Sequence, residues 1–552
     1  MTLFTSSQPP ISVPDIDIYN FLFQPNIYNT VRRHDQPLLI DGLSGKSISF
    51  QEAQTLSSQL ARGWKENVGL TKGDVVAVFA PNQYDHAVLY LSLLAAQCTI
   101  TPGNPNYTEA EFNYQIQKTK AKALVTVPSL LPILCKVAAN NGIPPERIYL
   151  FGEEAVGSIQ PLKSLAARHR NKPLLFPPKG DINPAEDTAF ICFSSGTTGI
   201  AKGVMLTHRN FVSQMILVSS YEEINPHEAA DVYIGFLPFY HIFGLTTLVL
   251  RAFYTNTQVV VVPKYELELV CRLIEKYKAT VCALVPPVAV HLAKNEAVLK
   301  YDLSSLKMIT SGAAPLSSEH IEALNLRVKA PVRQGYGLTE TTAGCIYQKV
   351  GVSLSGSSGV LLANMECKIV DVETGNEVGP DQPGEILLKG PVIMKGYLDD
   401  VDANNKTFTD DGFLRTGDVA IFNSKSKEFY IIDRIKELIK YKGFQVAPAE
   451  LEALIMSHES IADCCVVGVY DATQATELPR AYIVPQPSVP RNNDTIRIIT
   501  DFVNSNVANH KKLRGGVRII DQVPKSASGK ILRREVKEWI RKEQISANRA
   551  RL

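Results

Sequence analysis

Short apolar runs alternate with longer amphipathic stretches along the chain as far as residue 310. The stretches at 84–96, which is mostly apolar, and at 267–277 are predicted to be helices. The apolar runs are rich in valine and isoleucine, as is typical of buried strands, and they cover residues 75–79, 123–127, 189–193, 259–262, 281–285 and 307–310. Because strands that alternate with helices form helix-covered, largely parallel sheets, the pattern predicts an α/β fold. Residues 16–40 mix aromatic and polar positions, and we expect an irregular initial segment there.

The pattern changes after about Gly356. Short apolar runs are now separated by Gly/Pro/Asp turns, which indicates a β-rich module. A basic stretch follows Arg434 and leads into a predicted helix at 447–458, a strand at 464–469 and a helix at 495–507. We therefore expect two domains. Residues 1–433 form a large N-terminal domain of helix-covered sheets with the small β-rich module, and residues 434–552 form a small, mobile α+β domain.

Composition narrows the class of protein. The 552 residues are enough for more than one domain with its own core. Hydrophobic residues make up 45% and charged residues 20%, and the net charge of +2 argues against nucleic acid as the main partner. The nine cysteines are scattered, which suits reduced thiols and neither disulfides nor zinc. No apolar run is long enough for a transmembrane segment and residues 1–14 lack a secretory signal, so we expect a soluble intracellular protein.

The stretch 194–203 directly follows the predicted strand 189–193. It combines glycines, four hydroxyls and one lysine. Glycine lets backbone N–H groups turn toward an anion, while hydroxyls and ammonium add donors, so we expect a phosphate-binding loop. The common P-loop would need glycine at Ala201 and a hydroxyl at Gly203. The alternative is a flexible connector. The candidate phosphate ligands are Ser194, Ser195, Gly196, Thr197, Thr198 and Lys202.

Other segments each carry one chemically active side chain. His241 stands in the aromatic sequence Phe-Tyr-His-Ile-Phe-Gly, where a buried structural histidine is the alternative. In Gln-Gly-Tyr-Gly-Leu-Thr-Glu-Thr, Tyr336 offers a face for a base and Glu340 an oxygen ligand for Mg²⁺. Asp418 occupies a Thr-Gly-Asp turn that suits a ribose diol, although such turns are common. Lys530 ends a basic loop whose alternative role is surface solubility.

Together these segments resemble the acyl-adenylate-forming superfamily, which includes acyl–coenzyme A synthetases, 4-coumarate–CoA ligases and firefly luciferases. The matching motifs run in the family's order from Ser194 to Arg534. They include Ser-Ser-Gly-Thr-Thr-Gly-x-x-Lys-Gly, Thr-Gly-Asp, Asp-Arg-x-Lys-Glu and the final Ser-Gly-Lys, which are specific as a set. Ala201 and Ala527 stand where the family usually has proline. Both changes loosen a loop without removing a functional group, so we expect activity to survive.

The resemblance implies an AMP-forming ligase that joins a carboxylic acid to ATP as an acyl-adenylate, releases pyrophosphate and transfers the acyl group to coenzyme A. Lys530 would bridge the carboxylate and α-phosphate oxygens, and Glu340 would hold Mg²⁺. The implied ATP-binding set is Ser194, Ser195, Gly196, Thr197, Thr198, Lys202, Gln334, Gly335, Tyr336, Gly337, Thr339, Asp418, Arg434, Lys436 and Gln445.

The resemblance also implies a hinge near residues 433–436, about which the C-terminal domain rotates after pyrophosphate leaves. Rotation would withdraw Lys530 and bring in Lys440 for the second step. Coenzyme A would then contact Lys264, Lys442 and Gly443. His241 would change rotamer between the two steps.

The substrate is the least determined feature. The implied acyl pocket includes His241, Phe243, Thr247, Ala313 and Thr341. An aromatic residue at Phe243 favours a phenylpropanoid or related aryl acid. Thr310 stands where 4-coumarate–CoA ligases commonly have lysine, so a medium- or long-chain fatty acid is the alternative. A luciferase-type monooxygenase and a non-catalytic binding relative are further alternatives, although Lys202, Glu340 and Lys530 are all present.

The last three residues, Ala550, Arg551 and Leu552, fit a variant of the Ser-Lys-Leu peroxisomal address. We therefore expect a peroxisomal import receptor as a partner and the peroxisome as the location. The alternative is a solvated chain end in a cytoplasmic protein.

Overall fold

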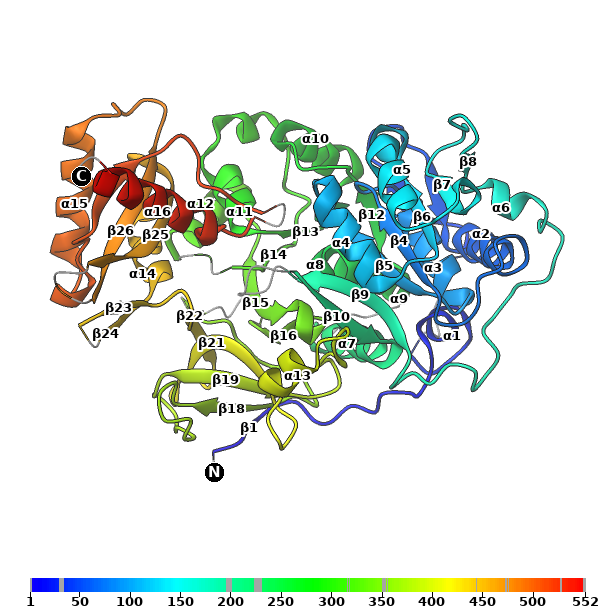
Figure 1. Ribbon diagram of the computed structural model, residues 1–552, viewed down its shortest axis with the longest axis horizontal. Coiled ribbons are helices and arrows are strands. Elements are labelled where there is room, and N and C mark those ends of the chain that lie inside the picture. The colour runs from blue at the N-terminus through cyan, green and yellow to red at the C-terminus, as the bar shows by residue number, and fades with distance from the viewer. Residues whose placement is uncertain are drawn as a thin grey trace.

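Two sheets carry most of the N-terminal half of the chain (Figure 1). The computed structural model describes residues 2–28, 34–194, 201–222, 231–314, 316, 318–349, 354, 356–442, 444–471, 474, 476–526 and 529–549. The first sheet has the strand order β20-β10-β9-β5-β4-β6-β7-β8. Its strands are β4 (Val75–Phe79), β5 (Thr99–Gly103), β6 (Ala123–Thr126), β7 (Ile148–Leu150), β8 (Gln160–Pro161), β9 (Thr188–Ser194), β10 (Lys202–Thr207) and β20 (Gly396–Tyr397).

The second sheet has the order β17-β16-β15-β14-β13-β11-β12-β2-β3. Its central strands run parallel, and the antiparallel pairs lie at its two ends. Its strands are β2 (Pro37–Asp41), β3 (Ser47–Ser49), β11 (Val232–Gly235), β12 (Gln258–Val261), β13 (Val281–Leu284), β14 (Met308–Ser311), β15 (Val332–Leu338), β16 (Ala343–Tyr347) and β17 (Val360–Leu361). The predicted α/β class is confirmed, but the sequence pattern did not divide these strands between two sheets.

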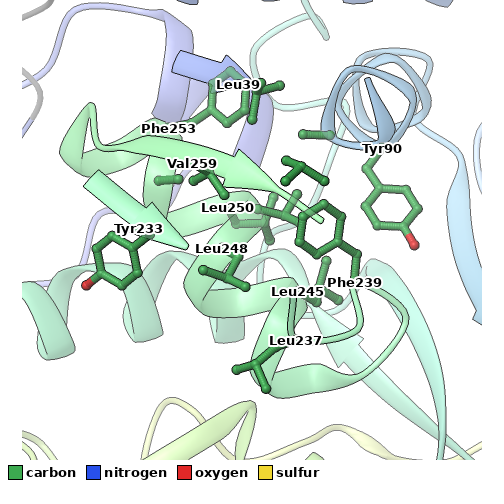
Figure 2. Close-up of a cluster of buried hydrophobic side chains, with 14 of the residues drawn as sticks. Leu39, Tyr90, Tyr233, Leu237, Phe239, Leu245, Leu248, Leu250, Phe253 and Val259 are labelled. Carbon is green, nitrogen blue, oxygen red and sulfur yellow. The ribbon is translucent and has the colours of Figure 1, made fainter. Parts of the chain in front are cut away.

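Helices cover both sheets, and one helix packs between them. Every residue of α3 (His86–Ala95) is buried. Its Tyr90 ring lies 5.5 Å from the Phe190 ring on β9, and its His86 ring lies 5.9 Å from the Phe239 ring, which follows β11. Figure 2 shows Tyr90 in the same apolar cluster as Phe239 and Val259. The two sheets therefore share one core.

The remaining N-terminal helices have their apolar faces in this core or on its outer side. The helix of residues 267–277 has the predicted bounds because its apolar positions recur every three or four residues. The helices are α1 (Ile18–Phe23), α2 (Phe50–Arg62), α4 (Glu109–Thr119), α5 (Leu131–Asn140), α6 (Ser164–Ala167), α7 (His208–Tyr221), α8 (Ile242–Gly244), the continuous π-helical turn η4 (Leu245–Leu250), α9 (Arg251–Thr255), α10 (Leu267–Tyr277), α11 (Pro286–Lys294), α12 (Ser318–Val328) and α13 (Val401–Thr407).

The prediction of an irregular segment at residues 16–40 is wrong in two places, since α1 and β2 both lie within it. All six residues of α1 are buried, so the helix has no polar face that would reveal its period. Asp17 caps the helix by accepting a hydrogen bond from Asn20 N at 3.0 Å.

The β-rich module is an antiparallel sheet in the order β1-β18-β19-β21-β22. Its first strand comes from the N-terminus, where Phe4 pairs with Cys367. The strands are β1 (Phe4–Thr5), β18 (Glu366–Val370), β19 (Gly384–Lys389), β21 (Leu414–Phe422) and β22 (Phe429–Arg434).

The C-terminal residues form an α+β unit with two small apolar clusters of their own. In Figure 1 this unit (orange to red) lies at one end of the molecule, beside α11 and α12. Its elements are β23 (Ile439–Tyr441), β24 (Phe444–Val446), α14 (Pro448–Ser457), β25 (Ile461–Asp471), β26 (Thr476–Pro485), α15 (Asn493–Asn506), β27 (Gly516–Ile519) and α16 (Arg533–Arg549). Among the described residues, no helix is both long and apolar enough to cross a bilayer.

Candidate active site

Lys530 is carried by the loop that precedes α16, and this loop contacts the N-terminal part of the chain. Its Gly529 has a φ of +77°, and a Cβ there would lie 3.1 Å from Val285 Cγ2 and 3.2 Å from Pro287 Cγ. Glycine therefore allows the loop to lie directly on the start of α11. Lys530 N donates to Ser526 Oγ at 3.1 Å, which fixes the backbone beside the ammonium group.

The Lys530 ammonium faces both cations and carboxylates. Burial and the Arg434 guanidinium lower the pKa of Lys530 to about 8, while Glu437, Asp418 and Glu340 act in the opposite direction. Lys530 therefore remains protonated at neutral pH. These interactions place the ammonium between the residues expected to bind ribose and the residue expected to bind metal.

His241 lies at the start of α8, on the same side as Lys530. Its Nδ1 accepts a hydrogen bond from Phe243 N at 3.3 Å. Burial and the Lys530 ammonium lower the pKa of His241 to about 4, so the imidazole is neutral at pH 7. The site thus contains a neutral imidazole beside a charged amine, and Lys530 supplies the positive charge.

Glu340 is held by residues from two distant segments. Ser194 Oγ donates to Glu340 Oε1 at 3.1 Å, and the Tyr397 hydroxyl donates to the same oxygen at 2.9 Å. Lys202 Nζ lies 4.7 Å from the centroid of the Tyr397 ring. The Glu340 carboxylate, which is the candidate metal ligand, therefore lies where β9, β10 and β20 meet.

Asp418 is the buried member of a second polar group. It is 4% exposed, it accepts a hydrogen bond from the Tyr336 hydroxyl at 2.7 Å, and its Oδ1 lies 3.5 Å from Arg434 Nε. Burial raises the pKa of Asp418, and Arg434 opposes that change. Arg434 compensates the buried charge, so the group can present carboxylate oxygens to a diol.

Two family models match this chain and identify the family to which it belongs. One described as AMP-binding enzyme matches residues 28–398, and one described as AMP-binding enzyme C-terminal domain matches residues 450–530. The chain belongs to the AMP-binding enzyme family. Its curated relatives are named as CoA ligases. The probable 4-coumarate–CoA ligase 1 of Dictyostelium discoideum is 36% identical over 98% of this chain and 98% of its own length, and the 4-coumarate–CoA ligase 1 of Narcissus pseudonarcissus is 36% identical over 97% and 96%.

Solved structures show the same fold. The ATP-bound MatB protein of Rhodopseudomonas palustris has a TM-score of 0.82 and 26% identity, with 95% of this chain and 99% of that chain covered. An anthranilate CoA ligase in complex with anthranoyl-AMP has a TM-score of 0.87 and 21% identity, with 96% and 98% covered. The superfamily and the fold class predicted from the sequence are confirmed.

Two side chains of this AMP-binding enzyme that are predicted to line the ligand site form hydrogen bonds with its backbone. Gln334 Oε1 accepts a hydrogen bond from Leu316 N at 2.7 Å. The Thr341 hydroxyl is fully buried and donates to Ala343 O at 2.6 Å. These contacts hold the glycine-rich segment in shape. The contacts of Gln334 with ATP and of Thr341 with the acid stay predictions.

The glycines of this segment are required by close backbone contacts. A Cβ at Gly337 would lie 1.8 Å from Ala343 O, and a Cβ at Gly335 would lie 2.7 Å from the Tyr347 ring. The ring of Phe243 packs on Gly312, where a Cβ would lie 3.2 Å from it. Ala313, next along the chain, has a φ of +71° and an exposed side chain. Thr339 begins the short 3₁₀ turn of residues 339–341 that carries Glu340.

Several residues expected to bind coenzyme A or ATP, or to act in the second step, lie at the surface of the structure. Lys264, Lys436, Lys440, Lys442 and Gln445 have exposed side chains. Lys440 and Lys442 lie on or beside the β23–β24 hairpin, whose backbone is tied to β26 through Thr476 and Glu477. The orientation seen here is thus the one that presents Lys530.

Some predicted residues lie outside the part of the chain that the structure describes. They are Ser195, Gly196, Thr197, Thr198, Gly443, Ala550, Arg551 and Leu552. The peroxisomal address therefore stays a prediction.

Sequence reasoning missed Tyr397 and Glu437. Tyr397 reaches Glu340 across 57 residues, and no local pattern links the two. Glu437 faces Lys530 and also pairs with Arg533 at 2.5 Å, which ties the hinge region to α16. One local signal in the sequence pointed to this ion pair, namely that Arg533 stands in the first turn of α16. A cation is unfavourable at the start of a helix unless it is paired.

The pKa of Lys530 predicts how the rate of adenylation depends on pH. In the adenylation half-reaction, kcat/KM is expected to be full below about pH 8 and to fall as the pH rises through the pKa, because the neutral amine cannot stabilise an anion. A pH profile of acyl-adenylate formation measures this directly. Lys530→Arg should abolish the alkaline fall, since a guanidinium stays charged. The same fall in both enzymes would assign it to another group.

Proposed function

We propose that this enzyme is an AMP-forming acid–thiol ligase that uses a carboxylic acid, ATP and coenzyme A. In the first step a carboxylate oxygen attacks the α-phosphorus and pyrophosphate leaves. In the second step the thiol sulfur of coenzyme A attacks the acyl carbon and AMP leaves. The observation that carries the proposal is the loop of Lys530, whose Gly529 lies against Val285 and Pro287 of the N-terminal part. From there the ammonium acts electrostatically on His241 and is acted on by Asp418 and Glu340.

The first step requires two anions to approach one another. A positive charge fixed where they meet lowers the barrier, and such preorganised charges are the largest single contribution in many enzymes. Lys530 supplies a point charge in a partly buried site, where it is screened less than in water. The neutral His241 adds no positive charge that would repel the Lys530 ammonium.

Mg²⁺ fits the donors present. Both contacts to the Glu340 carboxylate go to Oε1, and hard oxygen donors suit this ion. Among the described residues there is no group of three or more His, Cys, Asp or Glu that would form a complete protein cage. One carboxylate together with substrate phosphates is the usual Mg²⁺ arrangement. When bound, the ion would neutralise phosphate charge, and Glu340 and Lys202 would hold that end of the nucleotide.

The second step uses the other face of the C-terminal unit. Asp433 Oδ2 accepts a hydrogen bond from Ala449 N at 2.9 Å, and Ile435 N donates to Gly417 O at 2.9 Å, so residues 433–436 contact both parts of the chain. Hinges of this kind are a few backbone positions that absorb a large change of dihedral angle. Rotation there would bring Lys440, Lys442 and Gly443 to the site together with Lys264.

The acid is an aryl acid of the phenylpropanoid type. The curated relatives named above are 4-coumarate–CoA ligases. The Phe243 ring packs on Gly312, and its flat aromatic face suits a flat acid. A medium- or long-chain fatty acid would not use this flat face.

The experiment is a coenzyme A-dependent screen for AMP and pyrophosphate release over cinnamates, benzoates, phenylacetates and fatty acids. We expect release with cinnamates and the corresponding acyl-CoA as product. ADP and orthophosphate as products, or no release with any acid, would overturn the proposal. A preference for fatty acids would overturn the aryl-acid assignment alone.

A further inference from the structure

Tyr397, on the short strand β20, contacts both charged side chains at the end of the site that is predicted to hold Mg²⁺ and phosphate. Its hydroxyl donates a hydrogen bond to Glu340 Oε1 at 2.9 Å, and the Lys202 ammonium lies 4.7 Å from the centroid of its ring. An ammonium over an aromatic face is attracted by the electrons of the ring. One side chain therefore orients a carboxylate with its polar end and an ammonium with its apolar face.

The backbone around Tyr397 is fixed by neighbouring segments of the fold. Its strand pairs with β10, where Val204 lies opposite Tyr397. Asn404 of α13 contacts the residue twice, since Tyr397 N donates to Asn404 Oδ1 at 2.7 Å and Asn404 Nδ2 donates to Tyr397 O at 3.0 Å. Three residues earlier, Met394 N donates to Glu340 O at 2.8 Å. The hydroxyl and the carboxylate that it contacts therefore belong to segments whose backbones are hydrogen-bonded to each other.

The Tyr397 hydroxyl stays protonated over the physiological pH range. Burial and the Glu340 carboxylate raise the pKa of Tyr397 above its ordinary value. The hydroxyl is therefore a neutral donor, which fixes a carboxylate without cancelling its negative charge. A lysine or arginine in the same place would compensate the charge that attracts a metal ion.

The hydrogen bonds to the Glu340 carboxylate are concentrated on one of its two oxygens. The bond from Tyr397 and the bond from Ser194 Oγ at 3.1 Å both end on Oε1. Within the part of the chain that the structure describes, no hydrogen bond ends on Oε2. Carboxylates that bind metal ions are commonly oriented by hydrogen bonds from such outer partners. The two donors thus orient the carboxylate through Oε1, and Oε2 can face a cation.

Building on the ligase function proposed above, in which Glu340 holds Mg²⁺, we propose that Tyr397 is a positioning residue for the metal end of the site. Its hydroxyl holds the Glu340 carboxylate in the rotamer that binds the ion, and its ring holds the Lys202 ammonium beside the phosphates. Tyr397 acts through these two side chains and not through contact with the substrate. Removing such an outer partner typically costs about 10–100-fold in metal affinity or activity.

Tyr397→Phe tests the hydroxyl, because it removes the oxygen and keeps the ring. The probe is Mn²⁺, a spectroscopic substitute for Mg²⁺, with the full chain and α,β-methylene-ATP, which cannot be cleaved at the reacting bond. The dissociation constant of Mn²⁺ measured by electron paramagnetic resonance should rise at least about tenfold. In turnover, the half-saturating concentration of free Mg²⁺ should rise by a similar factor, and excess Mg²⁺ should restore kcat. KM for the acid should not change.

Two further variants calibrate this measurement. Tyr301→Phe removes another hydroxyl that donates to a glutamate, since the Tyr301 hydroxyl donates to Glu268 Oε2 at 3.0 Å in an exposed position. This matched control should leave the affinity for Mn²⁺ unchanged. Glu340→Gln removes the proposed metal ligand itself, and it should weaken Mn²⁺ binding at least as much as Tyr397→Phe does.

Tyr397→Leu tests the ring, because it removes the aromatic face as well as the hydroxyl. At saturating Mn²⁺ this variant should bind α,β-methylene-ATP about two- to fivefold more weakly than Tyr397→Phe, the usual value of one cation–π contact. The difference between the two variants should vanish in a Lys202→Ala background. If the difference persists there, the ring acts only by packing, which would overturn its role toward Lys202.

The outcomes distinguish this inference from the ligase function. Unchanged Mn²⁺ affinity in Tyr397→Phe together with weaker binding in Glu340→Gln would overturn the role of Tyr397 and leave the ligase function standing. A loss of activity in Tyr397→Phe that excess Mg²⁺ does not restore would show a merely structural role and would also overturn it. Unchanged affinity in both variants would overturn Glu340 as the metal ligand, and this inference with it. Failure of the wild-type enzyme to form an acyl-adenylate from any acid would overturn the ligase function itself.

Discussion

Lys530→Ala is expected to slow acyl-adenylate formation by at least about 10²–10³-fold, the usual cost of removing one electrostatic stabiliser. The ammonium is the cation that the C-terminal loop brings to the acyl side of the site, and alanine leaves the approaching anions unshielded. Pyrophosphate release in the absence of coenzyme A measures this step. The same variant should still convert synthetic acyl-adenylate and coenzyme A to acyl-CoA.

Two variants control this result. Lys525→Ala removes a lysine of the same loop whose ammonium pairs with Asp463 at 2.6 Å, and it should leave adenylation within about threefold of wild type. Lys442→Glu reverses an exposed charge expected to contact coenzyme A, and it should impair the second step while sparing the first. Equal losses in both half-reactions for Lys530→Ala or for Lys442→Glu would contradict the alternation of the two domain orientations.

Glu222→Gln is expected to lower the free energy of unfolding by about 3–5 kcal/mol, because it leaves the buried guanidinium groups of Arg251 and Arg333 without their carboxylate. Denaturant unfolding of the full chain measures the loss. Glu268→Gln is the matched control, since that carboxylate is half exposed and lies 3.9 Å from Lys300 Nζ, and its effect should be below about 1 kcal/mol.

Glu222 and its two arginines also predict that stability depends on pH. The two arginines hold the pKa of Glu222 below its ordinary value despite burial. The stability that Glu222 contributes is therefore present above its unfolded pKa and is lost as the pH falls through its folded pKa. The difference between wild type and Glu222→Gln should shrink on acidification. A difference that is small at neutral pH would show that the ion group is not a net contributor.

The local sequence pattern correctly predicted the elements whose secondary structure depends mainly on residues nearby in the chain. The strand at 75–79 and the helix at 267–277 have the predicted bounds, because the first is a β-branched run and the second has one apolar face. Helix α1 escaped detection because it is short and wholly buried. Strand β1 escaped because its two residues are a strand only through pairing with β18, more than 350 residues away.

The sequence by itself indicated the candidate chemical groups, namely a predicted phosphate loop, a carboxylate predicted to bind metal, an Asp and an Arg predicted to bind ribose, and a lysine on a C-terminal loop, in a fixed order. Only the tertiary structure decided which charges meet. It brought Lys530 within electrostatic range of Asp418 and Glu340, supported Glu340 with Tyr397, and buried Glu222 between two arginines. The reason is physical. A residue's capacity for charge or hydrogen bonding is a local property of its side chain, whereas its pKa and its partners depend on groups that only folding brings within a few ångströms.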